Sequence, residues 1–490
     1  MTVMKKNLVL WFIAAVCIIA SCTKDAGPEA GMDPSDAMLK AKPVHGPVVV
    51  LPPSGGDDTD NLLAAIAAAE PGTTIQLTAG DYHLAYIEVF GFEGCIKGAG
   101  RDKTIIKPYG LISQLEQEDL NYLPAWIKFI GGDVVLSDFA IVTGDGPLVS
   151  DVDPFYIQSL ISVLSVNNYN QVYNYADKLP MKFRLNNVDF QCGYLDPDLA
   201  YLGQPYNVIM PVWIGSDVWW PLEDIILTSG TYTVTNCTVE NAFQGYEAFS
   251  QGEDAVFTLD RCSATDCLYG AFFAANFNSR LFISNNSFKN IWWIGVDIED
   301  VDWGLISWVI PFRGTEYTVT GNVFSPMPGS SALVFLDSRG VTAPDNYKPT
   351  IGYAKNNLFN LVEGSNGIRC LNNRGAVIWN NRFAGVADYG IQVDGSMIID
   401  LWTGDELGMD EAENVLILGN NFNGLETLVA DIVMGEMSSN CTVVGNGSVI
   451  DSGTDNTITG MSMRHGGYHA GHSIRDNFRM MPRPGHHPHH

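Results

Sequence analysis

Short alternating runs of apolar and polar residues recur along this chain, and each ends in a polar corner followed by one large apolar residue. Such runs span Leu281–Phe288, Tyr317–Phe324, Ala376–Phe383 and Val415–Phe422. Alternation with a period of two is typical of a β-strand, because successive side chains point to opposite faces. The pattern therefore predicts many short strands, each of which ends at a corner.

Aligning the runs on their last apolar residue gives two apolar columns. The anchor column holds Ile141, Phe190, Val239, Ala264, Phe288, Phe324, Phe359, Phe383, Phe422 and Val449. The column five residues earlier holds Leu136, Leu185, Val234, Leu259, Ile283, Val319, Ala354, Ile378, Ile417 and Val444. The anchors Val239, Ala264 and Phe288 follow one another at steps of 25 and 24 residues. A unit this short cannot bury its apolar face alone, so we expect stacked units that form a solenoid.

The corner position, three residues before each anchor, is mostly asparagine. It holds Asn187, Asn236, Asn285, Asn356, Asn380 and Asn446, with Asp138, Arg261, Gly321 and Gly419 as exceptions. Asparagine tolerates the left-handed backbone conformation that a tight corner needs. Its side-chain amide can also bond to the same amide in the next unit, so a ladder of asparagines is expected at this position.

These columns predict an all-β fold, a right-handed single-stranded parallel β-helix with an N-terminal capping helix. Leucine-rich repeats are the main rival, but they need a denser leucine pattern and a helix or short turn in each unit. Here β-branched and aromatic residues dominate the repeated runs, as strands favour. A β-sandwich would not repeat at a fixed period.

The start of the repeat region carries a resemblance to a known superfamily. Asp57-Asp58-Thr59 has the residues of a helix N-terminus, and 62–69 has helix-forming composition. Strand-forming residues follow at Pro71–Leu77 and Ile96–Ile106, with a turn at Gly80–Tyr82. This passage resembles the N-terminal cap and first coils of pectate-lyase-like β-helix proteins, by motif over 55–108 and by repeat over 130–460. The resemblance implies the fold and a short helix that closes the core, and it implies no particular activity.

The first residues predict a lipoprotein signal peptide over 1–21. A basic start, Met4-Lys5-Lys6, precedes the apolar stretch Leu8–Ala20, which is too short to span a membrane as a helix. Ile19-Ala20-Ser21-Cys22 resembles a bacterial lipobox, which implies lipidation of Cys22. Cys22–Asp25 also resembles the export tag of surface lipoproteins in Bacteroidetes-type bacteria. The expected location is the outer membrane, at the cell surface or facing the periplasm, with a lipid anchor as the membrane contact.

Composition divides the remaining chain into three parts. Residues 22–50 are rich in Pro, Gly and Ala and predict a flexible tether. Residues 51–461 are expected to form the β-helix with its cap. Residues 462–490 contain seven of the nine histidines, and they predict a disordered tail without a defined metal site.

Charge and cysteine content narrow the possible partners. The chain has 490 residues, a net charge of -28, and 46% apolar residues, so it can bury a large core. An acidic surface of this kind repels phosphate backbones, so nucleic acid is not expected as a partner. Seven cysteines remain after the signal peptide and Cys22, and their spacing matches no metal motif. We expect them to be small core residues: Cys95, Cys192, Cys237, Cys262, Cys267, Cys370 and Cys441.

Candidate chemistry lies on a further strand that follows each anchor. In the run Gly295–Glu299, alternation turns Val296 and Ile298 inward and Asp297 outward. The outward column is predicted to hold Glu247, Phe272, Asp297, Arg369, Gln392 and Asp431, and a second outward column to hold Glu299 and Asp394. Stacked coils lie about 4.8 Å apart, so these residues are expected to form a polar stripe along one face.

Insertions border this stripe and are expected to form the wall of a groove. The segments 300–316, 338–351 and 395–414 carry Trp303, Trp308 and Trp402, and the larger insertions 143–182 and 193–231 carry Trp213, Trp219 and Trp220. Indole rings beside carboxylates are typical of a carbohydrate cleft. The alternative is that these tryptophans pack the loops onto the coil.

The histidine distribution limits the mechanism, since no histidine lies between His83 and His465. Acid–base work would then use carboxylates, Arg, Lys or Tyr. One route is glycoside hydrolysis by Asp297, Glu299 and Glu247. The other is β-elimination from a uronate, with Arg369 as base or charge neutraliser beside acidic residues that hold Ca²⁺. No metal-ligand set is identified, and no other cofactor is implied.

Two functions from different classes remain at this stage. One is a polysaccharide hydrolase or lyase, in which Asp394, Gln392 and the tryptophans Trp303, Trp308 and Trp402 would contact the glycan. The other is a non-catalytic lipoprotein that binds glycans or serves as an adhesin or structural surface protein. Neither the residue series of polygalacturonases nor the Trp-x-Asp-His and Arg-x-Pro-x-x-Arg patterns of pectate lyases occurs here. No family catalytic residue can therefore be carried over.

Overall fold

A computed structural model gives the arrangement of the coil. It describes residues 46–110, 125–144, 158–164, 181–193, 209–215, 230–249, 255–274, 279–300, 315–337, 351–399, 406–445 and 447–463. Within these ranges, no helix is both long enough and apolar enough to cross a membrane.

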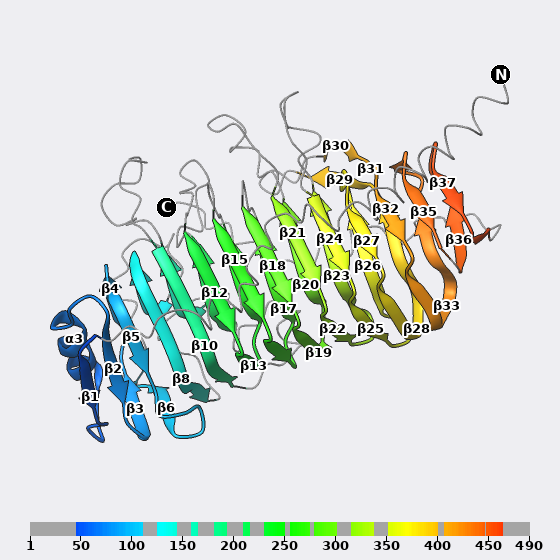
Figure 1. Ribbon diagram of the computed structural model, residues 1–490. Helices are drawn as coiled ribbons and strands as arrows, with labels where there is room; N and C mark the ends of the chain where they lie inside the picture. Colours follow the sequence, from blue (N-terminus) through cyan, green and yellow to red (C-terminus); the bar gives the residue numbers. More distant parts are fainter. Residues whose placement is uncertain are drawn as a thin grey trace, which may run out of the picture. The chain divides into compact units, whose positions relative to one another are not determined.

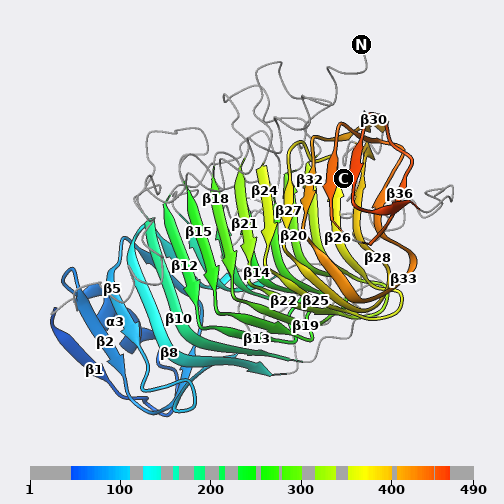
Figure 2. The same cartoon turned by 45° about the vertical axis from the view of Figure 1, so that its right-hand side comes forward.

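Parallel strands stack along the chain in three rows, and most coils contribute one strand to each row (Figures 1 and 2). The first row holds β1 (Val48–Leu51), β2 (Thr73–Leu77), β5 (Glu93–Lys97), the first halves of β8 (Gly132–Gly144) and β10 (Met181–Cys192), β12 (Thr231–Thr235), β15 (Val256–Asp260), β18 (Arg280–Ser284), β21 (Glu316–Thr320), β24 (Ile351–Lys355), β27 (Val377–Trp379), β32 (Leu416–Leu418), β35 (Thr442–Val444) and β37 (Thr457–Thr459).

The second row carries the anchors. It holds β3 (Gly80–Leu84), β6 (Thr104–Pro108), the second halves of β8 and β10, β13 (Thr238–Glu240), β16 (Ser263–Thr265), β19 (Ser287–Ile291), β22 (Val323–Pro326), β25 (Leu358–Leu361) and the first parts of β28 (Arg382–Asp394) and β33 (Asn421–Met434).

The third row carries the candidate chemistry. It holds β4 (Ile87–Phe90), β7 (Ala125–Ile130), β9 (Gln158–Leu164), β11 (Ile209–Gly215), β14 (Gln244–Phe249), β17 (Tyr269–Ala274), β20 (Ile294–Asp300), β23 (Ser331–Asp337), β26 (Asn366–Leu371), the last parts of β28 and β33, β36 (Ser448–Asp451) and β38 (Ser462–Met463). The predicted parallel β-helix is therefore confirmed.

Two small additions lie outside the three rows. β29 (Ser396–Ile399) and β30 (Glu406–Asp410) form an antiparallel pair inside the segment predicted as the insertion 395–414. β31 (Ala412–Glu413) pairs in parallel with β34 (Ser438–Ser439). The predicted insertions 143–182 and 193–231 are too broad, because they contain β9 and β11, which are ordinary strands of the third row.

The anchor column forms the centre of the core. Phe288, Phe324, Phe359, Phe383 and Phe422 stack on one another with ring centroids 4.7–5.3 Å apart. A glycine lies against four of these five rings, those of Phe288, Phe324, Phe383 and Phe422. A Cβ atom on Gly270 would lie 2.5 Å from the ring of Phe288. At these four rings the stack leaves little or no room for a Cβ atom on the glycine of the third-row strand.

The alignment fails at the last coil. Val443, not Val444, pairs with Ile417, and the side chain of Val444 is 41% exposed. Val449 pairs with Ile432 in the third row, so it is not an anchor. The reason is that, among the described residues, this coil passes from β35 to β36 without a second-row strand.

The corner prediction is confirmed for backbone conformation. Every predicted corner residue from Asp138 to Gly419 has φ between 53° and 68°, and Asn446 lies outside the described residues. The continuous ladder, however, runs one residue later, through buried amides joined Nδ2 to Oδ1 at 2.9–3.0 Å. Its members are Asn286, Asn322, Asn357, Asn381 and Asn420. The corner asparagines form only local contacts, such as Asn380 with Asn356 at 2.8 Å.

The N-terminal cap is the helix α3 (Thr59–Ala67), which begins at the predicted Asp57-Asp58-Thr59. Leu62 is buried in the core, and α3 lies beside β1 and β2 at the start of the coil (Figure 1). The Asp58 carboxylate accepts hydrogen bonds from the backbone N–H groups of Ser54 and His83, so it ties the cap to β3. β1 begins at Val48, within the stretch predicted as tether.

The seven cysteines in the described part of the chain are free thiols, as expected for small core residues. Six of them are buried and Cys95 is half-buried. Burial raises the pKa of the Cys267 thiol to about 12, so this thiol is protonated and unreactive near neutral pH.

Candidate active site

The outward column of the third row continues in register over most of the coil. It runs through Lys128, Ser162, Trp213, Glu247, Phe272, Asp297, Val334, Arg369, Gln392, Val433 and Ile450. Val296 and Ile298, on either side of Asp297, belong to the hydrophobic core. The predicted placement of Glu247, Asp297, Arg369 and Gln392 in one column on the side away from the core is therefore confirmed.

The predicted polar stripe is neither exposed nor continuous. Glu247, Asp297, Glu299, Arg369, Gln392 and Asp394 are all buried. Phe272 and Val334 occupy the coils next to Asp297 in the same column. The site is a set of buried polar groups with apolar side chains between them.

Asp431 does not belong to the outward column. Ala430 pairs with Tyr389 and Ile432 with Ile391, so Asp431 lies level with Gly390, and Val433 takes the place beside Gln392. The carboxylate of Asp431 accepts hydrogen bonds from the backbone N–H and the hydroxyl of Ser448. It holds the following coil in place.

Glu247 and Asp297 are the least satisfied groups of the column. Both side chains are fully inaccessible, and none of their four carboxylate oxygens has a hydrogen-bond partner within the described part of the chain. Burial raises the pKa of each carboxyl well above its ordinary value. They lie one coil on either side of Phe272, so their Cα atoms are about 10 Å apart. Two unpaired buried carboxyls are costly to the fold and mark a candidate functional site.

Asp297 and Glu299 form a coupled pair on β20. Burial raises the pKa of Glu299 to about 7, and the neighbouring Asp297 opposes this shift. For Asp297, burial comes first and the charge of Glu299 adds to it, whereas the charge of Arg369 lowers its pKa. The two carboxyls therefore titrate as a coupled pair, and no separate value belongs to Asp297 alone.

Arg369 is held in place by its neighbour on the next coil. Its Nε donates to Oε1 of Gln392 at 3.2 Å, and the Tyr389 hydroxyl donates to the same oxygen at 2.7 Å. Asp394 accepts the backbone N–H groups of Gly395 and Met437, and burial raises its pKa. Arg369 therefore presents a fixed positive charge between Asp297 and Asp394.

Tyr269 is a member of the site that the sequence pattern does not single out. Its ring contacts Trp293, Phe272 and Phe243 at centroid distances of 5.0, 5.3 and 6.2 Å. Burial raises the pKa of its phenol, and the charges of Asp297, Glu299 and Glu247 add to this. Alternation counts Tyr269 with the inward residues Ala271 and Phe273, which is why the pattern does not reveal it.

The predicted tryptophan wall falls mostly outside the described residues. Trp303, Trp308 and Trp402, as well as Trp219 and Trp220, lie there. Trp213 is described and fully buried in the column between Ser162 and Glu247. For this residue the packing alternative holds. The described ranges also contain no cluster of three His, Cys, Asp or Glu side chains that could hold a metal ion.

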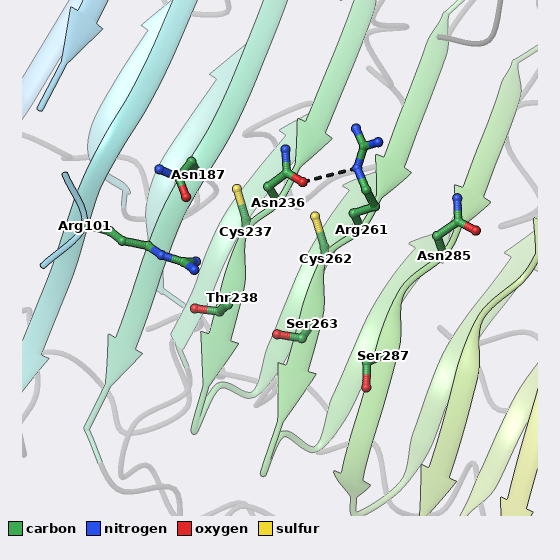
Figure 3. Close-up of a pocket in the computed structure, with 10 residues that line it drawn as sticks. All are labelled: Arg101, Asn187, Asn236, Cys237, Thr238, Arg261, Cys262, Ser263, Asn285 and Ser287. Atoms are coloured by element: carbon green, nitrogen blue, oxygen red, sulfur yellow. Dashed lines mark hydrogen bonds between the residues drawn. The ribbon is translucent and has the colours of Figure 1, made fainter. Parts of the chain in front are cut away.

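A separate open groove lies at the corner between the first and second rows (Figure 3). Its volume is about 550 Å³. It is lined by Arg101, Asn187, Asn236, Cys237, Thr238, Arg261, Cys262, Ser263, Asn285 and Ser287. The sequence pattern predicts none of these residues as a site, because the left-handed corner already explains the asparagines by structure alone.

Comparison with known proteins gives no family. No family model and no curated protein sequence matches the chain. Among solved structures, the chain is similar to a mannuronan C-5 epimerase A-module from Azotobacter vinelandii, with 13% identity, 84% and 96% of the two chains covered, and a TM-score of 0.41.

Two further solved structures have the same low level of similarity. The N-terminal fragment of gene product 12 from bacteriophage phi29 matches with 13% identity, 83% and 64% coverage, and a TM-score of 0.46. A polygalacturonase from Erwinia carotovora ssp. carotovora matches with 10% identity, 86% and 95% coverage, and a TM-score of 0.27. Likeness at this level says nothing about substrate, reaction or partner.

Proposed function

We propose that this protein is a carbohydrate-active enzyme that cleaves a polysaccharide by acid–base chemistry at the third row. The observation that carries the proposal is the pair of fully buried, unpartnered carboxyls, Glu247 and Asp297, in one outward column. Buried polar groups in native proteins nearly always have partners, so exceptions are expected where function requires them. A carboxyl pair flanking an aromatic floor is suited to a sugar ring.

The surroundings of the carboxyls suggest their roles. Glu247 has only burial acting on its pKa, which keeps it protonated and suits it to donate a proton to the leaving glycosidic oxygen. The Asp297–Glu299 pair lies near Arg369, which favours its charged form, so the pair is suited to accept a proton from water. A separation of about 10 Å between the Cα atoms leaves room for sugar and water between the two groups.

The β-elimination route remains the alternative within this proposal. It would use Arg369 to neutralise a uronate carboxylate, and it leaves an unsaturated product instead of adding water. The two routes differ in their products, so the assay below distinguishes them.

A polysaccharide panel tests the proposal. The mature protein should release reducing ends from at least one polymer, without absorbance from unsaturated uronate. Glu247→Gln should lose nearly all turnover, whereas Glu316→Gln, an exposed glutamate on the first row, should be unaffected. Absorbance from unsaturated ends would mean a lyase. Glycan binding without turnover would contradict the proposed enzymatic activity. It would instead support a non-catalytic protein that binds glycans or serves as an adhesin.

We also propose that the protein is a lipoprotein of the outer membrane, anchored through Cys22. The support is the signal-like sequence over 1–21 and the lipobox-like Ile19–Cys22. Palmitate labelling that disappears in Cys22→Ala would support the anchor. Labelling that is unchanged in the variant would contradict it.

A further inference from the structure

Arg261 has an unusual backbone conformation for its residue type. Among the described non-glycine residues with positive φ, thirteen are Asn or Asp, and Arg261, at φ 54°, is the single exception. Asn and Asp visit this region readily, whereas a long side chain is strained there. The neighbouring coils use Asn236 and Asn285 at the same corner. Strain of this kind persists where another requirement outweighs it.

The side chain of Arg261 borders the groove between the first and second rows. Its Nε donates to Asn236 Oδ1 at 3.2 Å, and its Nη2 lies 3.2 Å from Asp260 Oδ2. Arg101 borders the same groove, with Nη1 2.9 Å from Asp189 Oδ1. The two side chains are 45% and 42% exposed. Each guanidinium has five N–H donors, so donors remain for a ligand after these contacts.

Neutral polar groups line the groove in regular rows beside the two arginines. Thr238, Ser263 and Ser287 are register partners on three successive coils, so their hydroxyls repeat about every 4.8 Å. The corner amides of Asn236 and Asn285 flank Arg261 along the groove (Figure 3). Such a surface offers hydroxyl and amide groups as hydrogen-bond partners along its length, and guanidinium groups at Arg101 and Arg261.

We propose that this groove binds an acidic saccharide. Arg101 and Arg261 would contact its carboxylate or sulfate group, and the hydroxyl and amide rows would contact its sugar hydroxyls. A guanidinium fork matches the geometry of such two- and three-oxygen acid groups. This site is distinct from the buried carboxyls of the third row and does not depend on the proposed catalysis.

The test uses trigalacturonic acid and its fully methyl-esterified form, which removes the charge and keeps the sugar. Binding is measured by calorimetry on the mature protein carrying Asp297→Asn, which prevents cleavage of the ligand. Arg261→Asn, which introduces the residue of the neighbouring coils, should weaken binding roughly tenfold or more. Its thermal midpoint should stay equal or rise, because the strain is relieved. Arg101→Asn should also weaken binding, and Arg280→Asn, an exposed arginine outside the groove, should not.

Five outcomes would overturn the proposal. Full affinity in Arg261→Asn, or a lowered thermal midpoint, would show that Arg261 serves only its ion pair with Asp260. Binding of the methyl ester or of inorganic sulfate as tightly as the acid would exclude recognition of an acidic saccharide. Loss of binding in Arg369→Ala alone would place the ligand at the third row.

Discussion

At the scale of single residues, Glu247, Asp297 and Arg369 share one column on the side of the third row away from the core. The period of two by itself assigns Glu247, Asp297 and Arg369 to one column, and the strand register agrees. It cannot predict that these side chains are buried, because burial depends on segments distant in sequence. It also cannot find Tyr269, whose contacts with Trp293 and Phe272 come from packing and not from a period-two pattern.

At the same scale, the raised pKa of Glu299 predicts how the stability of the fold changes with pH. The unfolded chain releases this proton near the ordinary pKa of 4.5, whereas burial in the folded protein raises the pKa to about 7. The folded state therefore binds more protons over this interval, and Glu299 makes stability fall as the pH rises from about 4.5 to about 7. Urea unfolding across this range should show a shallower fall in Glu299→Gln than in the wild type. An equal slope in both proteins would mean that Glu299 titrates normally.

At the scale of elements, the strands and corners follow from the repeat, but the ladder does not. Asparagine is frequent at two successive corner positions. The sequence pattern places the ladder at the first of them, because asparagine tolerates the left-handed backbone conformation that this position needs. The buried ladder one residue later is continuous because its amides point into the core, where water cannot replace them.

The two asparagines at one corner allow a direct comparison. Asn381 accepts from the backbone N–H and the amide of Asn357 and donates to Asn420 and Ala354, all in the core. Asn381→Ala should lower the free energy of unfolding by roughly 1–3 kcal/mol for each partner left unsatisfied. Asn380→Ala, at the exposed corner, should cost less, because water replaces the lost contact with Asn356. Denaturant unfolding that ranks the two variants the other way would contradict the ladder.

At the scale of the whole molecule, the solenoid is predictable because each coil repeats the same three-strand unit. Long insertions interrupt that period, so the pattern assigns β9 and β11 to loops although they pair with their neighbours in the third row. The repeat pattern also fails at the final coils, where the chain between strands is shorter and not longer than in the other coils. The step from β35 to β36 is too short for a second-row strand, and the columns drift by one residue at Val444.

The two candidate sites lie on different parts of the coil. The buried carboxyls lie on the third row, whereas the groove of Arg101 and Arg261 lies at the corner between the first and second rows. Stacked coils bring residues far apart in sequence together within each site. A linear glycan could therefore contact several coils at once along the groove.

The central claim is that the buried carboxyls are kept for function at a cost to stability. The most direct measurement is the free energy of unfolding of Asp297→Asn, together with its turnover of whichever polymer the panel identifies. We expect the variant to be more stable than the wild type at pH 7, by roughly 1–3 kcal/mol. The difference should shrink as the pH falls toward 3.8, the ordinary pKa of Asp, because the wild-type carboxyl is then protonated in both states. Turnover should be lost. A variant that is less stable than the wild type and still fully active would contradict the account.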